Sequence, residues 1–222
     1  MFVIINNWRL FTRNFIGDDG RQGWVATGDG GRHPDGKRHE FAGKVIFGVL
    51  IFVVSELIMF VSLVLAFWFT RMNFPQWPPP GQPRLPALLT GMNTLVLAAS
   101  GIAMWVAYKR FVQDRHISFS RWLLVAAILG TLFLTLQGAE WIRLMQHGLT
   151  LSENVYGATF YIIIGFHGIH AFAALILIYH LLLSYKMARP RSLSYTRLLA
   201  CQIFWYFVVI VWPPLYVVMY LL

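Results

Sequence analysis

Five long apolar stretches follow one another along the chain, each separated from the next by a short polar segment. They cover residues 42–70, 85–112, 119–146, 156–185 and 195–222. A helix of about 20 apolar residues is long enough to cross the hydrocarbon core of a bilayer. Because every stretch exceeds this length, the pattern predicts an all-α integral membrane bundle of five transmembrane helices.

The composition separates this chain from soluble globular proteins. Of its 222 residues, 58% are hydrophobic and 12% are charged, whereas soluble domains carry about 25% charged residues. Residues 14–40 are rich in Gly, Asp, Arg and His and show no periodicity, which is typical of a segment outside the membrane. We therefore divide the chain into a cytoplasmic amino-terminal arm, residues 1–41, and a five-helix transmembrane domain, residues 42–222.

The basic residues lie mainly on one side of the expected bundle. The chain has 18 Lys and Arg against nine Asp and Glu. The surplus falls in the connections and not on one polar face, so it gives no reason to expect a nucleic-acid partner. With five alternating helices, 15 basic residues fall on the side of the amino terminus and three on the other side. Since cytoplasmic loops carry the excess of Lys and Arg, we expect the amino terminus inside and the carboxyl terminus outside.

Cysteine and histidine usage argues against a redox centre within this chain. Cys201 is the single cysteine, which excludes an intrachain disulfide, a thiolate-bridged copper pair and a cysteine-ligated zinc site. A bis-histidine haem needs ligands on opposite sides of the macrocycle. The histidines of the apolar stretches, His167, His170 and His180, all lie on one expected helix. We therefore expect no haem or metal in this chain and interpret the histidines as polar packing groups or partners of a carboxylate.

Glu56 lies in the middle of the first apolar stretch, where an ionised side chain is expensive. The 18 Val, Leu, Ile and Phe residues of this stretch favour insertion by up to roughly 5–11 kcal/mol, against about 3 kcal/mol for one acidic residue. The helix is therefore expected to insert with Glu56 facing protein or a water-filled crevice. Two interpretations stay open: a glutamic acid hydrogen-bonded to a neighbouring helix, and a proton-responsive or lipid-contacting group.

Glu140 lies near the end of the third stretch, close to the expected outer surface. This position predicts a side chain that reaches interfacial water. Gln137 precedes it by three residues, so the two side chains can share a face and form a hydrogen bond in either protonation state. His167 and His170 have the same spacing and also share a face. The candidate proton-responsive or lipid-contacting residues are Glu56, Glu140, His167 and His170.

Small residues form two candidate helix-packing surfaces. Gly48, Ser55 and Ser62 recur every seven residues in the first stretch, which places them on one seam where another helix can approach closely. Gly165 and Gly168 permit a similarly close backbone approach in the fourth stretch. We interpret both surfaces as structural.

Several short motifs resemble subunit III of the haem-copper terminal oxidases, in the same order along the chain. They are Val54-Ser55-Glu56, Met92-Asn93-Thr94, Ala99-Ser100-Gly101, Leu136-Gln137-Gly138-Ala139-Glu140-Trp141, Tyr156-Gly157-Ala158-Thr159-Phe160, Gly165-Phe166-His167-Gly168-Ile169-His170, Trp205-Tyr206-Phe207-Val208 and Val211-Trp212. The resemblance covers residues 42–222 and is specific through the order and spacing of these motifs. It points to a five-helix form that lacks the first two helices of many family members.

The resemblance implies a non-catalytic subunit III of a bacterial cytochrome c oxidase in the aerobic respiratory chain, within the cytoplasmic (inner) membrane. Such a subunit packs on the haem-copper subunit I, accompanies subunit II and in some cases a larger respiratory supercomplex, binds phospholipid, and supports proton uptake and turnover stability. Haem and copper then lie in the partner subunits. By position, Glu56 matches the family's membrane-buried, carbodiimide-reactive carboxylate. Glu140, His167 and His170 match other recurrent polar residues of the family.

This chain departs from the family pattern at a few positions. Ile164 stands where the family usually has Thr, and Tyr206 and Val209 stand where it often has His and Asp. No polar role is carried over to Tyr206 and Val209.

Alternatives exist within and outside the family. A quinol oxidase subunit III or a nitric oxide reductase accessory subunit would share the same motifs. A secondary transporter is the alternative from another class, since intramembrane acids and histidines often line ion paths. Five helices, however, offer no even inverted repeat.

Overall fold

The computed structural model describes residues 34–77, 85–150, 155–187 and 195–221. Every regular element in these ranges is helical. The chain divides into two compact units, residues 1–45 and 46–222. The expected arm falls in the first unit, and its residues 1–33 lie outside the described ranges. The first described helix already begins at Pro34, a residue whose fixed φ and missing N–H suit the first turn of a helix.

Five helices of the structure are long and apolar enough to cross a membrane. The elements are α2 (Pro34–Met72), α3 (Ala87–Val112), α4 (His116–Gln146), α5 (Val155–Met187), α6 (Tyr195–Tyr216) and a π-helical turn, η2 (Val217–Leu221). Each of the five apolar stretches corresponds to one of the five long helices. The prediction of an all-α, five-span membrane protein is therefore confirmed.

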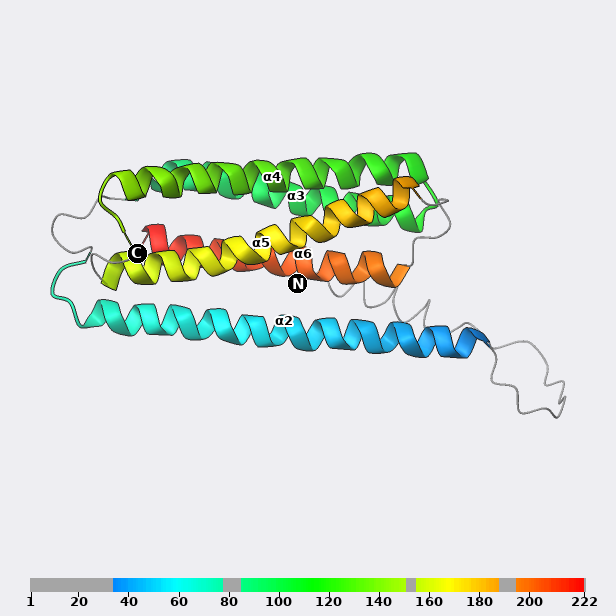
Figure 1. Cartoon of the computed structure of the whole chain (residues 1–222), viewed down its shortest axis with the longest axis horizontal. Coiled ribbons are helices and arrows are strands. Elements are labelled where there is room, and N and C mark those ends of the chain that lie inside the picture. The colour runs from blue at the N-terminus through cyan, green and yellow to red at the C-terminus, as the bar shows by residue number, and fades with distance from the viewer. Residues whose placement is uncertain (1–33, 78–84, 151–154, 188–194, 222) are drawn as a thin grey trace, which may run out of the picture. The chain divides into compact units, whose positions relative to one another are not determined.

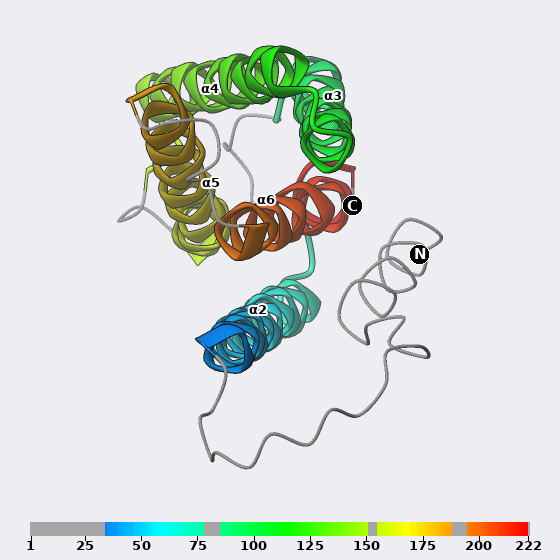
Figure 2. The same ribbon diagram turned by 90° about the vertical axis from the view of Figure 1, so that its right-hand side faces the viewer.

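Helices α3 to α6 form a four-helix bundle within the second unit (Figures 1 and 2). Seen along the helix axes in Figure 2, they follow one another around a ring, so that α6 returns to the side of α3. The interior is filled by large apolar side chains. Those with almost no exposure include Trp205, Trp212, Phe119, Phe133, Phe160 and Leu123.

The part of α2 within the second unit, residues 46–72, touches the bundle along a narrow stripe. Most of its side chains are exposed, but Phe60 and Phe67 are 2% and 1% exposed. The Phe60 ring lies 5.4 Å from His170 and 6.0 Å from Phe207, measured between ring centroids. Aromatic contacts therefore attach α2 to the side of the bundle formed by α5 and α6.

A glycine-dependent turn ends α4 and directs the chain toward α5. Gly148 has a φ of 92°, a conformation that side chains with a Cβ rarely adopt. Its N–H donates to the carbonyl of Met145, and the N–H of Leu149 donates to the carbonyl of Leu144. These bonds satisfy carbonyls that the helix end would otherwise leave free. The turn therefore ends α4 a short distance after Glu140.

Candidate functional site: two membrane acids

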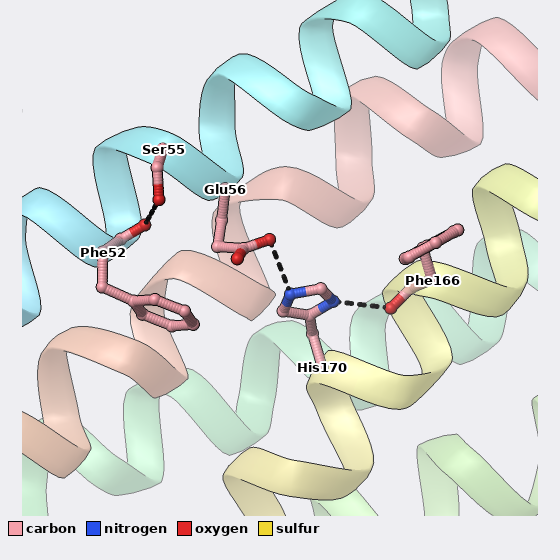
Figure 3. Close-up of polar contacts among 5 residues, drawn as sticks. All are labelled: Phe52, Ser55, Glu56, Phe166 and His170. Carbon is pink, nitrogen blue, oxygen red and sulfur yellow. Dashed lines mark hydrogen bonds and ion pairs between the residues drawn. The ribbon is translucent and has the colours of Figure 1, made fainter.

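Glu56 of α2 and His170 of α5 are brought together at the stripe where α2 meets the bundle (Figure 3). Glu56 Oε2 lies 3.0 Å from His170 Nε2. The two side chains are 20% and 12% exposed, in the order Glu56 and His170. The structure thus places the membrane acid against a neighbouring helix, with a histidine as its partner.

The hydrogen bonds of His170 define how many protons this pair holds. His170 Nδ1 lies 2.7 Å from the carbonyl oxygen of Phe166. A carbonyl only accepts, so Nδ1 carries a proton. The 3.0 Å contact between Nε2 and Glu56 then needs a second proton, which can belong to the imidazolium or to the carboxylic acid. Both forms have zero net charge, which is the inexpensive state in an apolar environment.

Aromatic rings surround this pair on the bundle side. Phe60, Phe204 and Phe207 have ring centroids within 5.4–6.3 Å of the His170 ring. Phe52 in turn packs on Phe204 at 5.7 Å. These rings provide few polar groups that could replace the partner of either residue. The contact between Glu56 and His170 is therefore the main means by which each polar tip is satisfied.

His167 shares the face of His170 but serves a different purpose. It is 1% exposed, and neither ring nitrogen has a hydrogen-bond partner. Its ring lies 4.8 Å from Trp212 and 6.3 Å from both Phe60 and Phe133. Of the two roles expected for these histidines, His167 therefore has the packing role, and His170 is the partner of a carboxylate.

Glu140 is buried, and the expectation that it reaches interfacial water is wrong. Its side chain is 3% exposed. Thr90 of α3 lies beside it, with 2.7 Å between Thr90 Oγ1 and Glu140 Oε2. The sequence placed Glu140 near the end of an apolar stretch, but Thr90 at the start of α3 and Tyr220 of η2 cover this part of α4. Hydropathy along one helix carries no information about such coverage.

Gln137 joins Glu140 in a buried polar cluster with Asn93, Thr90 and Tyr220, of which the last two were not singled out in the sequence. Asn93 Nδ2 donates to Gln137 Oε1 at 3.3 Å, and Gln137 Nε2 donates to the Tyr220 hydroxyl at 3.0 Å. Asn93 Nδ2 also donates to the carbonyl of Phe133 at 3.1 Å. The cluster therefore links α3, α4 and the carboxyl-terminal turn η2.

The sequence contains a signal for this cluster. Thr90 and Asn93 are three residues apart on α3, and Gln137 and Glu140 are three residues apart on α4. Thr90 pairs with Glu140, whereas Asn93 pairs with Gln137. From the first pair to the second, the residue number increases on α3 and decreases on α4, as expected for antiparallel neighbouring helices. Matched polar pairs on consecutive apolar helices would thus have indicated the register.

Only some of the small residues in the two candidate packing surfaces contact another helix of this chain. A Cβ added at Gly168 would lie 2.7 Å from the Trp141 ring, whereas a Cβ at Gly48 or Gly165 would have no neighbour within 4 Å. Ser55 and Ser62 are exposed, and their hydroxyls bond to carbonyls of their own helix. No described helix of this chain covers the Gly48, Ser55 and Ser62 seam, so the packing of a helix on it stays a prediction.

Metal-binding potential is low among the residues that the structure describes. No three or more His, Cys, Asp or Glu side chains gather there in a group that could hold a metal ion. Cys201 is buried and free. The expectation that this chain has no cofactor of its own remains a prediction.

Comparison with known proteins gives one consistent family. The family model described as cytochrome c oxidase subunit III matches residues 34–222. The chain is 33% identical over 180 residues to cytochrome c oxidase subunit 3 of Synechocystis sp., covering 80% of this chain and 75% of that protein. It is 30% identical over 187 residues to the same subunit of Thermostichus vulcanus, covering 83% and 90%. A probable cytochrome c oxidase subunit 3 of Nocardia farcinica is 30% identical over 176 residues, covering 79% and 87%.

Proposed function

Because the chain belongs to the cytochrome c oxidase subunit III family, we propose that it acts as a non-catalytic subunit beside the haem-copper subunit I. The family makes it a multi-pass membrane subunit of a terminal oxidase, associated with other subunits of that complex. Our proposal adds that it supports proton uptake and turnover stability, that it contacts subunits I and II within a bacterial inner membrane, and that haem and copper belong to those partners.

The observation that carries this proposal is the 3.0 Å contact between Glu56 Oε2 and His170 Nε2. The pair shares one proton that can reside on either partner without a change in net charge. Acidic residues and histidines in contact within a membrane are typical of groups that bind and relay protons. The pair supports a role in handling protons and offers no means of electron transfer.

The exposed surface of α2 supports the proposed contact with phospholipid. Phe47, Ile58 and Phe69 are 62–67% exposed. Apolar side chains of this size on a membrane helix suit acyl chains, whereas the interior of a bilayer disfavours polar side chains at such positions. Glu56 lies on the same helix, so lipid and acid are close neighbours in the proposed complex.

Family membership affects the alternative functions differently. Membership of the family removes the support for a secondary transporter. A quinol oxidase or nitric oxide reductase association differs from our proposal in the electron donor and the partner subunits. The proposed donor is cytochrome c.

Purification of the tagged full-length chain in mild detergent tests the proposal. We expect it to retain a haem-copper subunit I and a subunit II that carries a dinuclear copper site, both identified by mass spectrometry and metal analysis. A Glu56→Gln chain should retain the same partners, which separates assembly from proton handling. Recovery of the chain alone, or with a quinol-oxidising or nitric oxide-reducing partner, would contradict the proposal.

A further inference from the structure

The hydroxyl of Thr90 has two oxygen neighbours but only one proton. Thr90 Oγ1 lies 2.7 Å from Glu140 Oε2 and 3.1 Å from the carbonyl oxygen of Pro86. A carbonyl oxygen only accepts, and an ionised carboxylate only accepts. Full use of both contacts therefore requires a second proton, and the only group in this trio that can supply it is the carboxyl of Glu140.

An ionised Glu140 fits its surroundings poorly. It would accept one hydrogen bond from Thr90 and leave the contact with Pro86 without a proton. Its other oxygen, Oε1, is buried and has no hydrogen-bond partner. Glu140 forms no ion pair with any described residue, and Arg143, one turn further along α4, is exposed. Thr90, Gln137 and Tyr220 can offer hydrogen bonds to the carboxyl group, but all three are neutral. A buried carboxylate with no cation beside it is strongly disfavoured in an apolar interior.

A neutral Glu140 satisfies the same geometry. Its Oε2–H donates to Thr90 Oγ1, and the Thr90 hydroxyl donates to the carbonyl of Pro86. Oε1 is then an ordinary carbonyl oxygen, and a carbonyl with few partners is better tolerated in protein interiors than an unpaired charge. We propose that Glu140 is an occluded proton-binding site, held as the neutral acid and donating to Thr90, so that its proton fastens α4 to α3.

The groups around Glu140 are consistent with a permanently held proton. Thr90 faces it from α3, and Gln137 neighbours it on α4. From η2 the titratable group is Tyr220, whose hydroxyl lies close enough to the carboxyl group to interact with it by a hydrogen bond and electrostatically. All three are uncharged at neutral pH. No described Lys, Arg or His contacts the carboxyl, so nothing nearby favours release of the proton.

This site differs from the pair of Glu56 and His170 in both partner and access. His170 can take the proton of Glu56, whereas Thr90 can only share a hydrogen bond with Glu140. Glu56 is 20% exposed and Glu140 is 3% exposed. The inference therefore does not depend on the proposed role of Glu56 or on the identity of the partner subunits.

Infrared spectroscopy of the full chain in lipid nanodiscs tests the proposal. Glu56→Gln is used as the background, so that Glu56 cannot contribute. We expect a carbonyl band of a protonated carboxylic acid that persists between about pH 6 and about pH 9, well above the ordinary glutamic acid range. The band should disappear on adding Glu140→Gln. The amide of that variant can donate to Thr90 in place of the acid, so the fold should be retained. Absence of such a band, or a band unaffected by Glu140→Gln, would overturn the proposal.

Two Thr90 variants test the bond itself, and they decide the matter even if Glu140→Gln does not fold. Thr90→Ser keeps the hydroxyl and should leave the acid band in place. Thr90→Val keeps the shape but removes the acceptor, so the band should move to higher frequency as the acid loses its hydrogen bond. A band that is the same in Thr90→Val and Thr90→Ser would show that the acid does not donate to Thr90.

Discussion

Glu56 depends on a geometry that an amide can imitate but a methyl group cannot. In Glu56→Gln the side-chain amide donates to His170 Nε2, while Nδ1 still donates to Phe166. The hydrogen bonds survive, but the pair can no longer exchange its shared proton. This residue therefore allows packing and proton handling to be separated by one substitution.

We expect Glu56→Gln to change stability by no more than about 1 kcal/mol, because each hydrogen bond is replaced. The assembled oxidase should nevertheless complete several-fold fewer turnovers before it inactivates, measured as oxygen consumption over time. Ser62→Ala is the matched control on the same helix, since alanine keeps a small side chain on the seam and removes only the hydroxyl that bonds to the carbonyl of Ile58. A turnover lifetime equal to that of the control would count against a functional Glu56.

The sequence indicated the candidate residues better than it indicated their partners. The spacing of His167 and His170 correctly implied a common face. Which of them meets an acid depends on where α2 packs, and the partner, Glu56, is 114 positions away in the chain. The misplacement of Glu140 has the same origin, because its burial depends on Thr90 and Tyr220 from other helices.

Helix α4 contains a close approach that one glycine makes possible. A Cβ added at Gly130 would lie 2.6 Å from Trp205 Cη2 and 2.8 Å from Leu175 Cδ2. Trp205 is completely buried, so its ring has little room to move. Gly138 lies two turns further along α4 and would place a Cβ in open space. The same Gly-to-Ala substitution can therefore be compared at a crowded site and at an open site of one helix.

Gly130→Ala should destabilise the bundle by about 1–3 kcal/mol, as overpacked cores do. Gly138→Ala should be neutral or stabilise by up to about 1 kcal/mol, because alanine favours the helix. Thermal unfolding in detergent, followed by circular dichroism, compares the two. Equal unfolding temperatures for both variants would show that α5 and α6 do not pack against α4 as described.

The number of spans was predictable from hydropathy, but their ends were less so. The third stretch was expected to start at residue 119, whereas α4 begins at His116. Apolar runs mark the part of a helix that lies in hydrocarbon, and the helix itself can continue into the interface, where polar residues are accepted. The helix beginning at Pro34 shows the same effect.

The whole chain is proposed to contain no haem or copper of its own. Deleting the gene for this chain should leave the haem absorption spectrum of the remaining oxidase nearly unchanged, because no haem ligand is lost. Activity should be present at first and decline faster than in the complete enzyme. Optical spectra of both preparations provide the check, and loss of a haem band would show that this chain supplies a ligand.

The contact between Glu56 and His170 has a consequence for biosynthesis. A ribosome delivers α2 to the membrane well before it has made α5, so the acid enters the bilayer while its histidine does not yet exist. The apolar neighbours of Glu56 must carry it through this interval, at an expense of about 3 kcal/mol. When α5 inserts, His170 provides a partner for Glu56 and removes this energetic cost. The contact therefore favours association of α2 with α5 over leaving α2 alone in the lipid.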